Sequence, residues 1–332
     1  MSGEPRYVGA AWRSRFLKAP KIGLRLAERD DFVAIRDLAI VSLGIKTGAD
    51  RFFFVRRLAE RPIGALAGAN RGTTWVEGFE GWRGRIANKD LLPAIVGPHD
   101  LLDNGRRHFR VPKITDRLYL QPARRQSADL AQYISLGEVA RLPKSPLVAQ
   151  NASSDWWRQE RNIVRAPWAL PYNSAYDYGA WDNAGGAVLN GRFVGVTPNG
   201  GVSSELLGAV LNSTFAMVGR MLEGMATGTE GALDVGPPAV RLIRVPDVRR
   251  FDREAADEVR NVLARLRRED TMPPAPDTNG FVSTQRRELD LALLRGLGQS
   301  AGEATALLEE VYTSYGRWRA DVEGVERDTQ VN

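Results

Sequence analysis

The segment Gly-Ile-Lys-Thr-Gly at residues 44–48 contains side chains that could hold an anion. Lys46 offers an ammonium group, Thr47 offers a hydroxyl, and the flanking glycines leave backbone N–H groups open to phosphate oxygens. The same residues suit a plain β-hairpin, in which Gly48 takes a positive φ angle and the phenylalanines at 52–54 fill a core strand. Taken alone these residues favour the hairpin, and phosphate contact by Lys46 and Thr47 is the alternative.

Arginine and tryptophan side chains elsewhere in the first two-thirds of the chain could also contact nucleic acid. The planar guanidinium suits phosphates and base edges, and an aromatic ring beside an arginine forms a platform for an unstacked base. The candidates are Arg71, Arg83, Arg85, Arg106, Arg107 and Lys113 in expected loops, and the cluster Trp156, Trp157 and Arg158. Because large aromatic side chains are more often buried, at least one tryptophan of that cluster is expected in the core.

Several kinds of enzymatic chemistry lack their residues in this sequence. It does not contain the phosphate-binding pattern G-x-x-x-x-G-K-[ST]. There is no cysteine, and His99 and His108 are the two histidines, which excludes thiolate catalysis and disfavours histidine-metal nucleases. No lysine has an acidic residue two positions before it, as a common class of metal-dependent nuclease requires. The sequence therefore predicts no catalytic residue and no bound metal.

The charge balance permits a nucleic-acid partner. The 332 residues include 46 basic and 40 acidic side chains, which gives a formal net charge of +6. Nearly all of the positive charge is arginine, which either contacts phosphates or covers a solvated surface. No apolar run approaches the roughly 20 residues that span a bilayer, and the N-terminus lacks the hydrophobic stretch of a signal peptide. A cytoplasmic protein with no membrane partner is expected.

The elements that position these residues change in character near Gly201. Before it, short apolar runs bounded by Gly, Pro, Asn or Asp predict strands joined by long loops. After it, apolar residues recur at the spacing of one helical face. The predicted helices cover residues 204–225, 253–268, 283–298 and the segment from Ser300 onward. The predicted fold class is α+β, with a leader at 1–20, a β-rich domain at 21–250 and a helical region at 251–325 that contains a linker at 271–281.

Six short stretches follow one another in order along the chain. They are Leu17-Lys18-Ala19-Pro20; Gly44–Ala49 leading into Phe52–Phe54; Trp156-Trp157 through Pro171-Tyr172-Asn173; Leu206–Ser213; Gly231–Asp234 with Val245-Pro246; and Arg286–Asp290. Together they resemble the C-terminal target-recognition half of adenine-specific DNA methyltransferases of the type IIG restriction–modification and phage-defence kind. The resemblance covers nearly the whole chain and implies that residues 21–250 form a target-recognition domain.

The resemblance implies double-stranded DNA as a partner, and it adds Tyr172 and Asn173 to the candidate DNA contacts. The Asn/Asp-Pro-Pro-aromatic tetrad of an adenine methyltransferase is absent, since the Pro-Pro pairs follow Gly236 and Met272. AdoMet is therefore expected on a partner, the catalytic adenine methyltransferase subunit, and not on this chain. Met1 and the polar residues after it favour a separately encoded specificity subunit over a fragment of a larger enzyme.

The expected function is sequence-specific DNA binding that directs the separate methyltransferase. Arginines on phosphates would set the register, loop side chains would read the major groove, and the partner would flip the adenine. Two alternatives stay open at this point. One is a scaffold or regulatory subunit of a defence complex that does not bind DNA, and the other is a nuclease with an unrecognised site.

Overall fold

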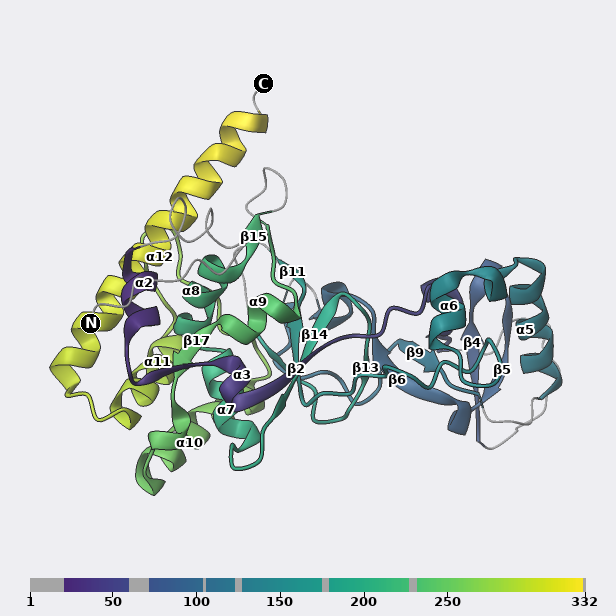
Figure 1. Ribbon diagram of the computed structural model, residues 1–332, viewed down its shortest axis with the longest axis horizontal. Helices are drawn as coiled ribbons and strands as arrows, with labels where there is room; N and C mark the ends of the chain where they lie inside the picture. The colour runs from purple at the N-terminus through teal and green to yellow at the C-terminus, as the bar shows by residue number, and fades with distance from the viewer. Residues whose placement is uncertain are drawn as a thin grey trace, which may run out of the picture. The chain divides into compact units, whose positions relative to one another are not determined.

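The computed structural model describes residues 21–59, 72–103, 106–122, 127–174, 179–226 and 232–330, and its fold is α+β as the sequence predicts (Figure 1). The predicted leader at 1–20 lies outside these residues. The chain forms two compact units, which we call the helical unit and the sheet unit. Of the residues that the structure describes, those within 1–41, 170–182 and 196–332 form the helical unit, and those within 42–169 and 183–195 form the sheet unit.

The unit boundaries differ from the predicted domain boundaries. The predicted division at residue 250 runs through the helical unit, since helix α10 (Arg253–Glu269) packs on α7 (Ser204–Leu211). The chain passes between the units within strands β2 (Ala39–Leu43), β10 (Trp168–Pro171) and β14 (Phe193–Pro198). Together with β12 (Trp181–Asp182), these strands form a sheet in the order β12-β10-β14-β2. Each unit therefore combines stretches that are distant in the sequence, and changes in composition along the chain do not predict such a division.

The sheet unit is built on a sheet with the strand order β13-β6-β9-β3-β4-β5. Its strands are β13 (Val188–Leu189), β6 (Leu91–Ile95), β9 (Arg117–Leu120), β3 (Phe54–Arg57), β4 (Thr73–Glu77) and β5 (Arg83–Ala87). Neighbouring strands are antiparallel except for β13 and β6, which are parallel. The unit also contains α4 (Asp50–Phe53), α5 (Ala128–Val139), α6 (Pro146–Asn151) and the short pair β7 (Leu102–Asp103) and β8 (Arg106–Arg107).

The phenylalanines at 52–54 are buried in the core of the sheet unit, as predicted. The Phe52 ring stacks on Tyr133 at a centroid distance of 4.5 Å, and the Tyr133 hydroxyl donates a hydrogen bond to the Phe52 carbonyl at 2.8 Å. Tyr119 lies opposite Phe54 across the β9–β3 ladder. Burial raises the pKa of Tyr133 above its ordinary value, so this phenol stays protonated and keeps its role as a donor.

The predicted hairpin around Lys46 is wrong. Strand β2 precedes this segment and pairs in the four-stranded sheet, whereas β3 follows it and pairs in the six-stranded sheet. Gly48 does take a positive φ of 77°, but the chain then enters the helical turn α4. The Thr47 hydroxyl accepts a hydrogen bond from the Ala49 N–H, and such local side-chain bonding favours the start of a helical turn over a hairpin.

The helical unit contains most of the long helices. They include α2 (Lys21–Glu28), α8 (Thr214–Glu223), α9 (Pro237–Leu242), α11 (Thr284–Gly296) and α12 (Ala301–Gln330), together with α7 and α10. The unit also contains a strand pair, β1 (Phe32–Ala34) with β17 (Arg244–Pro246), and a sheet of β11 (Asn173–Ser174), β16 (Leu233–Asp234) and β15 (Met225–Ala226). Among the described residues, no helix combines the length and apolar character needed to cross a membrane.

The single helix predicted at 204–225 is wrong, because the structure divides it into α7 and α8. Ser203 caps α7 by accepting a hydrogen bond from the Leu206 N–H. Ser213 caps α8 by accepting a hydrogen bond from the Ala216 N–H. Between the helices, the Asn212 side chain bonds both the N–H and the carbonyl of Ala180, at 2.9 and 3.0 Å. The Asn212 side chain thereby satisfies the backbone N–H and carbonyl of Ala180, and helix α7 ends just before this residue.

The segment 271–281 contains no helix or strand, as expected of a linker, but a buried arginine binds it. Arg286 on α11 donates hydrogen bonds to the carbonyls of Pro273 and Pro274, each at 2.6 Å, and to the carbonyl of Asn212 at 2.9 Å. Asp290, one turn later, accepts from the Thr214 N–H and hydroxyl and from the Tyr312 hydroxyl. These contacts join α8, α11, α12 and the proline-rich segment into one packed region.

Candidate nucleic-acid interface

A cleft of about 440 Å³ opens beside the Gly-Ile-Lys-Thr-Gly segment in the sheet unit. Its lining residues are Lys46, Thr47, Gly48, Asp50, Leu147, Asn190, Gly191 and Arg192. Lys46 and Thr47 are thus brought together with the turn at 190–192, which follows strand β13. No local sequence pattern points to Asn190 or Arg192, because they reach the cleft only where two distant backbone segments cross.

Backbone hydrogen bonds hold the two sides of the cleft together. The Gly191 N–H donates to the Ile45 carbonyl, and the Ile45 N–H donates to the Leu189 carbonyl, each at 2.8 Å. A Cβ atom on Gly44 would stand 2.1 Å from the Asn190 carbonyl oxygen, a distance that no real side chain adopts. Only glycine therefore permits this close approach of the two chain segments.

One of the lining residues of the cleft is a hydrogen-bonded carboxylate, Asp50. Asp50 accepts from the Thr47 hydroxyl at 2.5 Å on one oxygen and from the Asn190 side-chain amide at 2.8 Å on the other. Thr47 is fully buried, and its hydroxyl both donates to Asp50 and accepts from the Ala49 N–H. The Thr47 hydroxyl, a predicted phosphate contact, is therefore already used in positioning Asp50.

Two exposed cations lie at the cleft, Lys46 and Arg192. Neither forms an ion pair with any residue that the structure describes. The backbone at both positions is fixed: the Asn151 amide donates to the Lys46 carbonyl at 2.6 Å, and the Arg192 N–H donates to the Asn190 side chain at 3.1 Å. The positive charges are thus available to solvent while their attachment points are held in place.

The tryptophan cluster lies against the core instead of forming a free stacking platform. Trp156 contacts Phe52 at a centroid distance of 5.0 Å and meets Trp157 edge-on at 6.1 Å, and both indoles are half-buried. Arg158 pairs with Glu160, and 14% of its side chain is exposed. These positions fit the expectation of a buried tryptophan, and they leave little surface for an unstacked base.

The remaining candidates in the sheet unit differ in how far their charges are neutralised. The expectation that Arg83 and Arg85 lie in loops is wrong, because both belong to strand β5, which pairs with β4. Arg83 shares Glu77 with Arg56, each at 3.0 Å. Arg85 lies 5.5 Å from the Trp75 ring and 3.8 Å from the Asp129 carboxylate. Lys113 is exposed and has no ion-pair partner within the described ranges.

The structure says little about three other predicted DNA contacts, Arg71, Arg106 and Arg107. The last two predicted contacts, Tyr172 and Asn173, belong to the helical unit. Arg106 and Arg107 form strand β8, opposite Asp103 and Leu102, and Arg107 is half-buried. Arg71 lies outside the described residues. In the helical unit, the Asn173 amide donates to Asp234 at 2.7 Å, and the Tyr172 carbonyl accepts from Val235 at 2.8 Å. Arg107, Tyr172 and Asn173 are not among the lining residues of the cleft at Lys46.

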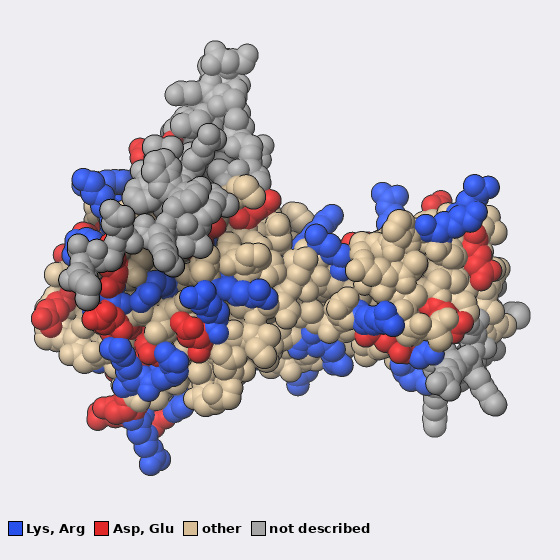
Figure 2. Space-filling model, in the orientation of Figure 1, with Lys and Arg blue, Asp and Glu red and all other residues tan. Residues whose placement is uncertain are grey.

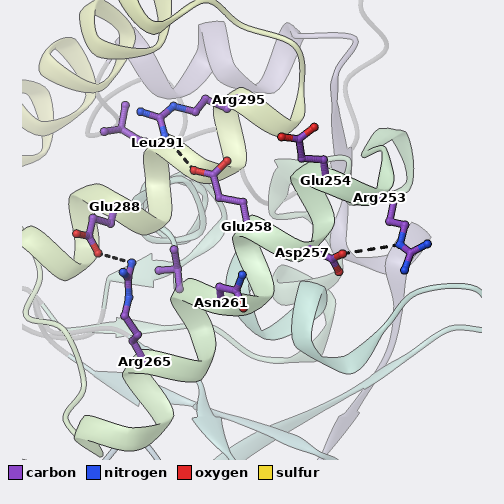
Figure 3. A pocket seen from close by; sticks show the side chains of 10 residues that line it. Arg253, Glu254, Asp257, Glu258, Asn261, Arg265, Glu288, Leu291 and Arg295 are labelled. Carbon is purple, nitrogen blue, oxygen red and sulfur yellow. Dashed lines mark hydrogen bonds and ion pairs between the residues drawn. The ribbon is translucent and has the colours of Figure 1, made fainter.

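A larger groove, of about 810 Å³, lies between helices α10 and α11 of the helical unit (Figure 3). Its arginines face carboxylates: Arg295 lies 2.9 Å from Glu258, and Arg265 lies 2.6 Å from Glu288. Figure 3 shows these pairs bridging the groove. Because its positive charges are neutralised internally, the groove is a poorer anion site than the smaller cleft at Lys46.

Charges of both signs are interspersed on the face drawn in Figure 2, where Lys and Arg side chains lie among Asp and Glu. In the described part of the chain, no group of three or more His, Cys, Asp and Glu side chains is arranged to hold a metal ion. On this face the cations are distributed individually among acidic side chains and do not form a continuous basic surface.

Comparison with known proteins identifies a shared fold. No family description and no curated protein matches this sequence. Among solved structures, the chain is similar to the type IIG restriction endonuclease BpuSI, with a TM-score of 0.56 and 11% sequence identity. The match covers 90% of this chain and 32% of BpuSI, so the chain spans about a third of that protein. At this identity the similarity concerns the fold alone.

Proposed function

We propose that this chain is a DNA-specificity subunit of a restriction–modification or phage-defence system. In this proposal it binds a short sequence in double-stranded DNA and directs a separate AdoMet-dependent adenine methyltransferase to that site. The observation that supports the proposal most is the fold similarity, which covers 90% of the chain and corresponds to part of a type IIG restriction endonuclease. The order of the six sequence stretches supports the same assignment.

The proposed mechanism is binding without catalysis by this chain. Exposed cations such as Lys46, Arg192 and Lys113 contact phosphates and set the register of the protein on the duplex. Loop side chains then distinguish base pairs in the major groove, where each pair presents a different pattern of donors and acceptors. AdoMet and the flipped adenine belong to the methyltransferase.

Selection from a pool of random duplexes tests the proposal directly. The purified chain is bound to the pool, and the retained duplexes are amplified and sequenced over several rounds. We expect enrichment of one short sequence, and an affinity for it that falls steeply with added salt because phosphate contacts release counterions. The absence of duplex binding at low salt would contradict the proposal and favour a scaffold.

Methyl transfer and DNA cleavage are measured on the enriched duplex. The chain alone is expected to transfer no methyl group from AdoMet and to leave plasmid DNA intact in Mg²⁺ or Mn²⁺. A methyltransferase encoded beside this chain is expected to modify the enriched sequence more rapidly when the chain is added. Transfer or cleavage by the purified chain alone would replace the proposal with an enzymatic function.

A further inference from the structure

We infer that the cleft between Lys46 and Arg192 is a binding site for one backbone phosphate of the DNA duplex. This inference rests on the proposed function and makes it more specific, since it assigns a ligand group to two residues. Lys46 and Arg192 are exposed, line the same cleft and form no ion pair with a described residue. The two cations share the cleft with a single carboxylate, Asp50, so the lining keeps a net positive charge that favours an anion.

The acidic groups near the cleft are already hydrogen-bonded. Each oxygen of Asp50 accepts a hydrogen bond from a neighbour, one from Thr47 and one from Asn190. Asp100 accepts from the Val96 and Gly97 N–H groups, at 2.6 and 3.2 Å. Neither carboxylate lies within ion-pair distance of Lys46 or Arg192, so both cations stay available to a ligand.

The backbone preorganises the pair of cations. Arg192 follows Asn190 and Gly191, whose hydrogen bonds to Asp50 and Ile45 tie this turn to the Lys46 segment. A Cβ atom on Gly191 would lie 2.7 Å from the Lys46 Cγ, so any larger residue at this position would displace the Lys46 side chain. A site whose side-chain attachment points are fixed loses less conformational entropy when it binds.

A backbone phosphate is favoured over a free phosphate by the shape and charge of the site. The cations are exposed at an open cleft, and the described lining contains no further lysine or arginine. A free phosphate or pyrophosphate carries more charge than a diester and is usually surrounded by several donors. A diester bears a single charge and needs room for the chain on both sides, which an open cleft provides.

The test compares wild type with Lys46→Gln, Arg192→Gln and the double variant in duplex binding across a range of KCl concentrations. We expect each single variant to weaken binding about fivefold at low salt, with no preference among duplex sequences. The double variant is expected to lower the slope of log affinity against log salt by about 1, the loss of one phosphate contact.

Two further variants separate position from net charge. Lys89→Gln removes an exposed lysine of the same unit that does not line the cleft, and it is expected to change affinity less than about twofold. Gly191→Ala keeps every charge but displaces the Lys46 side chain, and it is expected to weaken binding as Lys46→Gln does. Equal losses in Lys89→Gln and Lys46→Gln would overturn the inference.

Inorganic pyrophosphate distinguishes the two sources of a phosphate group. If pyrophosphate binds wild type and not the double variant, while both proteins bind duplex equally, the cleft holds a free phosphate and the inference is wrong. If wild type binds duplex and the double variant binds it equally well, the inference fails and the proposed function stands. If wild type binds no duplex, both fail.

Discussion

The helical unit and the sheet unit use positive charge in opposite ways. In the helical unit, buried arginines replace missing backbone donors: Arg286 binds three carbonyls, and Arg220 binds the carbonyls of Ser174 and Leu233. In the sheet unit, Lys46 and Arg192 lie exposed with no ion-pair partner among the described residues. The net charge of +6 therefore mixes cations that stabilise the fold with cations available to a ligand.

The difference follows from what surrounds each residue. Proline has no N–H, so the segment around Pro273 and Pro274 cannot pair as a strand does, and its carbonyls need another donor. A guanidinium supplies several donors in one plane and is the side chain best suited to that need. At the cleft, backbone N–H groups and the side-chain amides of Asn151 and Gln159 already satisfy neighbouring carbonyls, so the Lys46 and Arg192 side chains are not needed as donors there.

The largest effect is expected from Arg286→Ala. Three carbonyls would lose their donor, and the neighbouring buried Asp290 would lose a favourable charge, so the free energy of unfolding should fall by about 3–5 kcal/mol. Urea unfolding followed by circular dichroism measures the change. Arg287→Ala is the matched control, because Arg287 lies beside Arg286 on α11 and is half-exposed. If Arg286→Ala lowered the free energy of unfolding by less than about 1 kcal/mol, the buried arginines of the helical unit would not stabilise the fold to the extent that we expect.

A smaller but still large effect is expected in the sheet unit from Gly44→Ala. The added Cβ would stand 2.1 Å from the Asn190 carbonyl oxygen, so the backbone crossing must open. Overpacking of this kind costs about 1–3 kcal/mol, and we expect the upper part of that range because the neighbour is backbone. Gly185→Ala is the control in the same unit, since no atom lies within 4 Å of its Cβ position. Thermal unfolding of both variants gives the comparison.

A moderate, pH-dependent effect is expected from Asp247→Asn in the helical unit. Burial alone would raise the pKa of Asp247, but the bidentate hydrogen bond and the charge of Arg249, with the charge of Arg250, lower it. A carboxyl whose folded-state pKa is lowered stabilises the fold above its unfolded pKa and loses that contribution as the pH falls through its folded pKa.

Asp247→Asn should therefore lower the free energy of unfolding by about 1 kcal/mol near neutral pH. The difference from wild type should begin to narrow below about pH 4, where the carboxyl of the unfolded chain becomes protonated, and should continue to narrow as the pH falls through the lowered folded-state pKa. Urea unfolding across this pH range measures both quantities. A difference that stays constant with pH would show that the charge of Asp247 contributes nothing, in contrast to the other buried ionic contacts of this unit.

The smallest effect is expected from Arg83→Gln. This arginine was a candidate DNA contact, but it shares Glu77 with Arg56, so its charge is already partly neutralised locally. We expect no measurable change in stability, and a loss of duplex affinity smaller than that of Lys46→Gln at every salt concentration. A larger loss for Arg83→Gln would mean that ion pairing in the free protein does not identify which cations contact DNA.

The local features of the fold were predictable from sequence. Gly48 has its positive φ, the phenylalanines at 52–54 are buried, and Ser203 caps its helix. At Ser300, the capping box forms through reciprocal hydrogen bonds with Glu303. Each of these features depends on neighbours within a few residues, which is the range over which propensity and spacing act.

The errors arose where a distant segment decides the outcome. The apolar residues from 204 to 225 continue without interruption past Asn212, because α7 and α8 are both buried along most of their length. The spacing of apolar residues therefore does not show that the helix breaks there. The hairpin prediction was wrong because β2 and β3 pair in different sheets, and the residues around the turn do not indicate which sheet each strand joins. Arg192 was missed for the same reason, since only the backbone crossing at Gly44 makes it a neighbour of Lys46.

The sheet unit consists of two separate stretches of chain, 42–169 and 183–195, and this has a practical consequence for anyone who wishes to isolate it. A fragment ending at 169 would lose strand β13 and the Asn190 amide that binds Asp50. Its sheet would expose an edge beside β6, which invites aggregation. The soluble form of this unit would be a circularly permuted gene that fuses the second stretch to the first, or two peptides that reassemble when mixed.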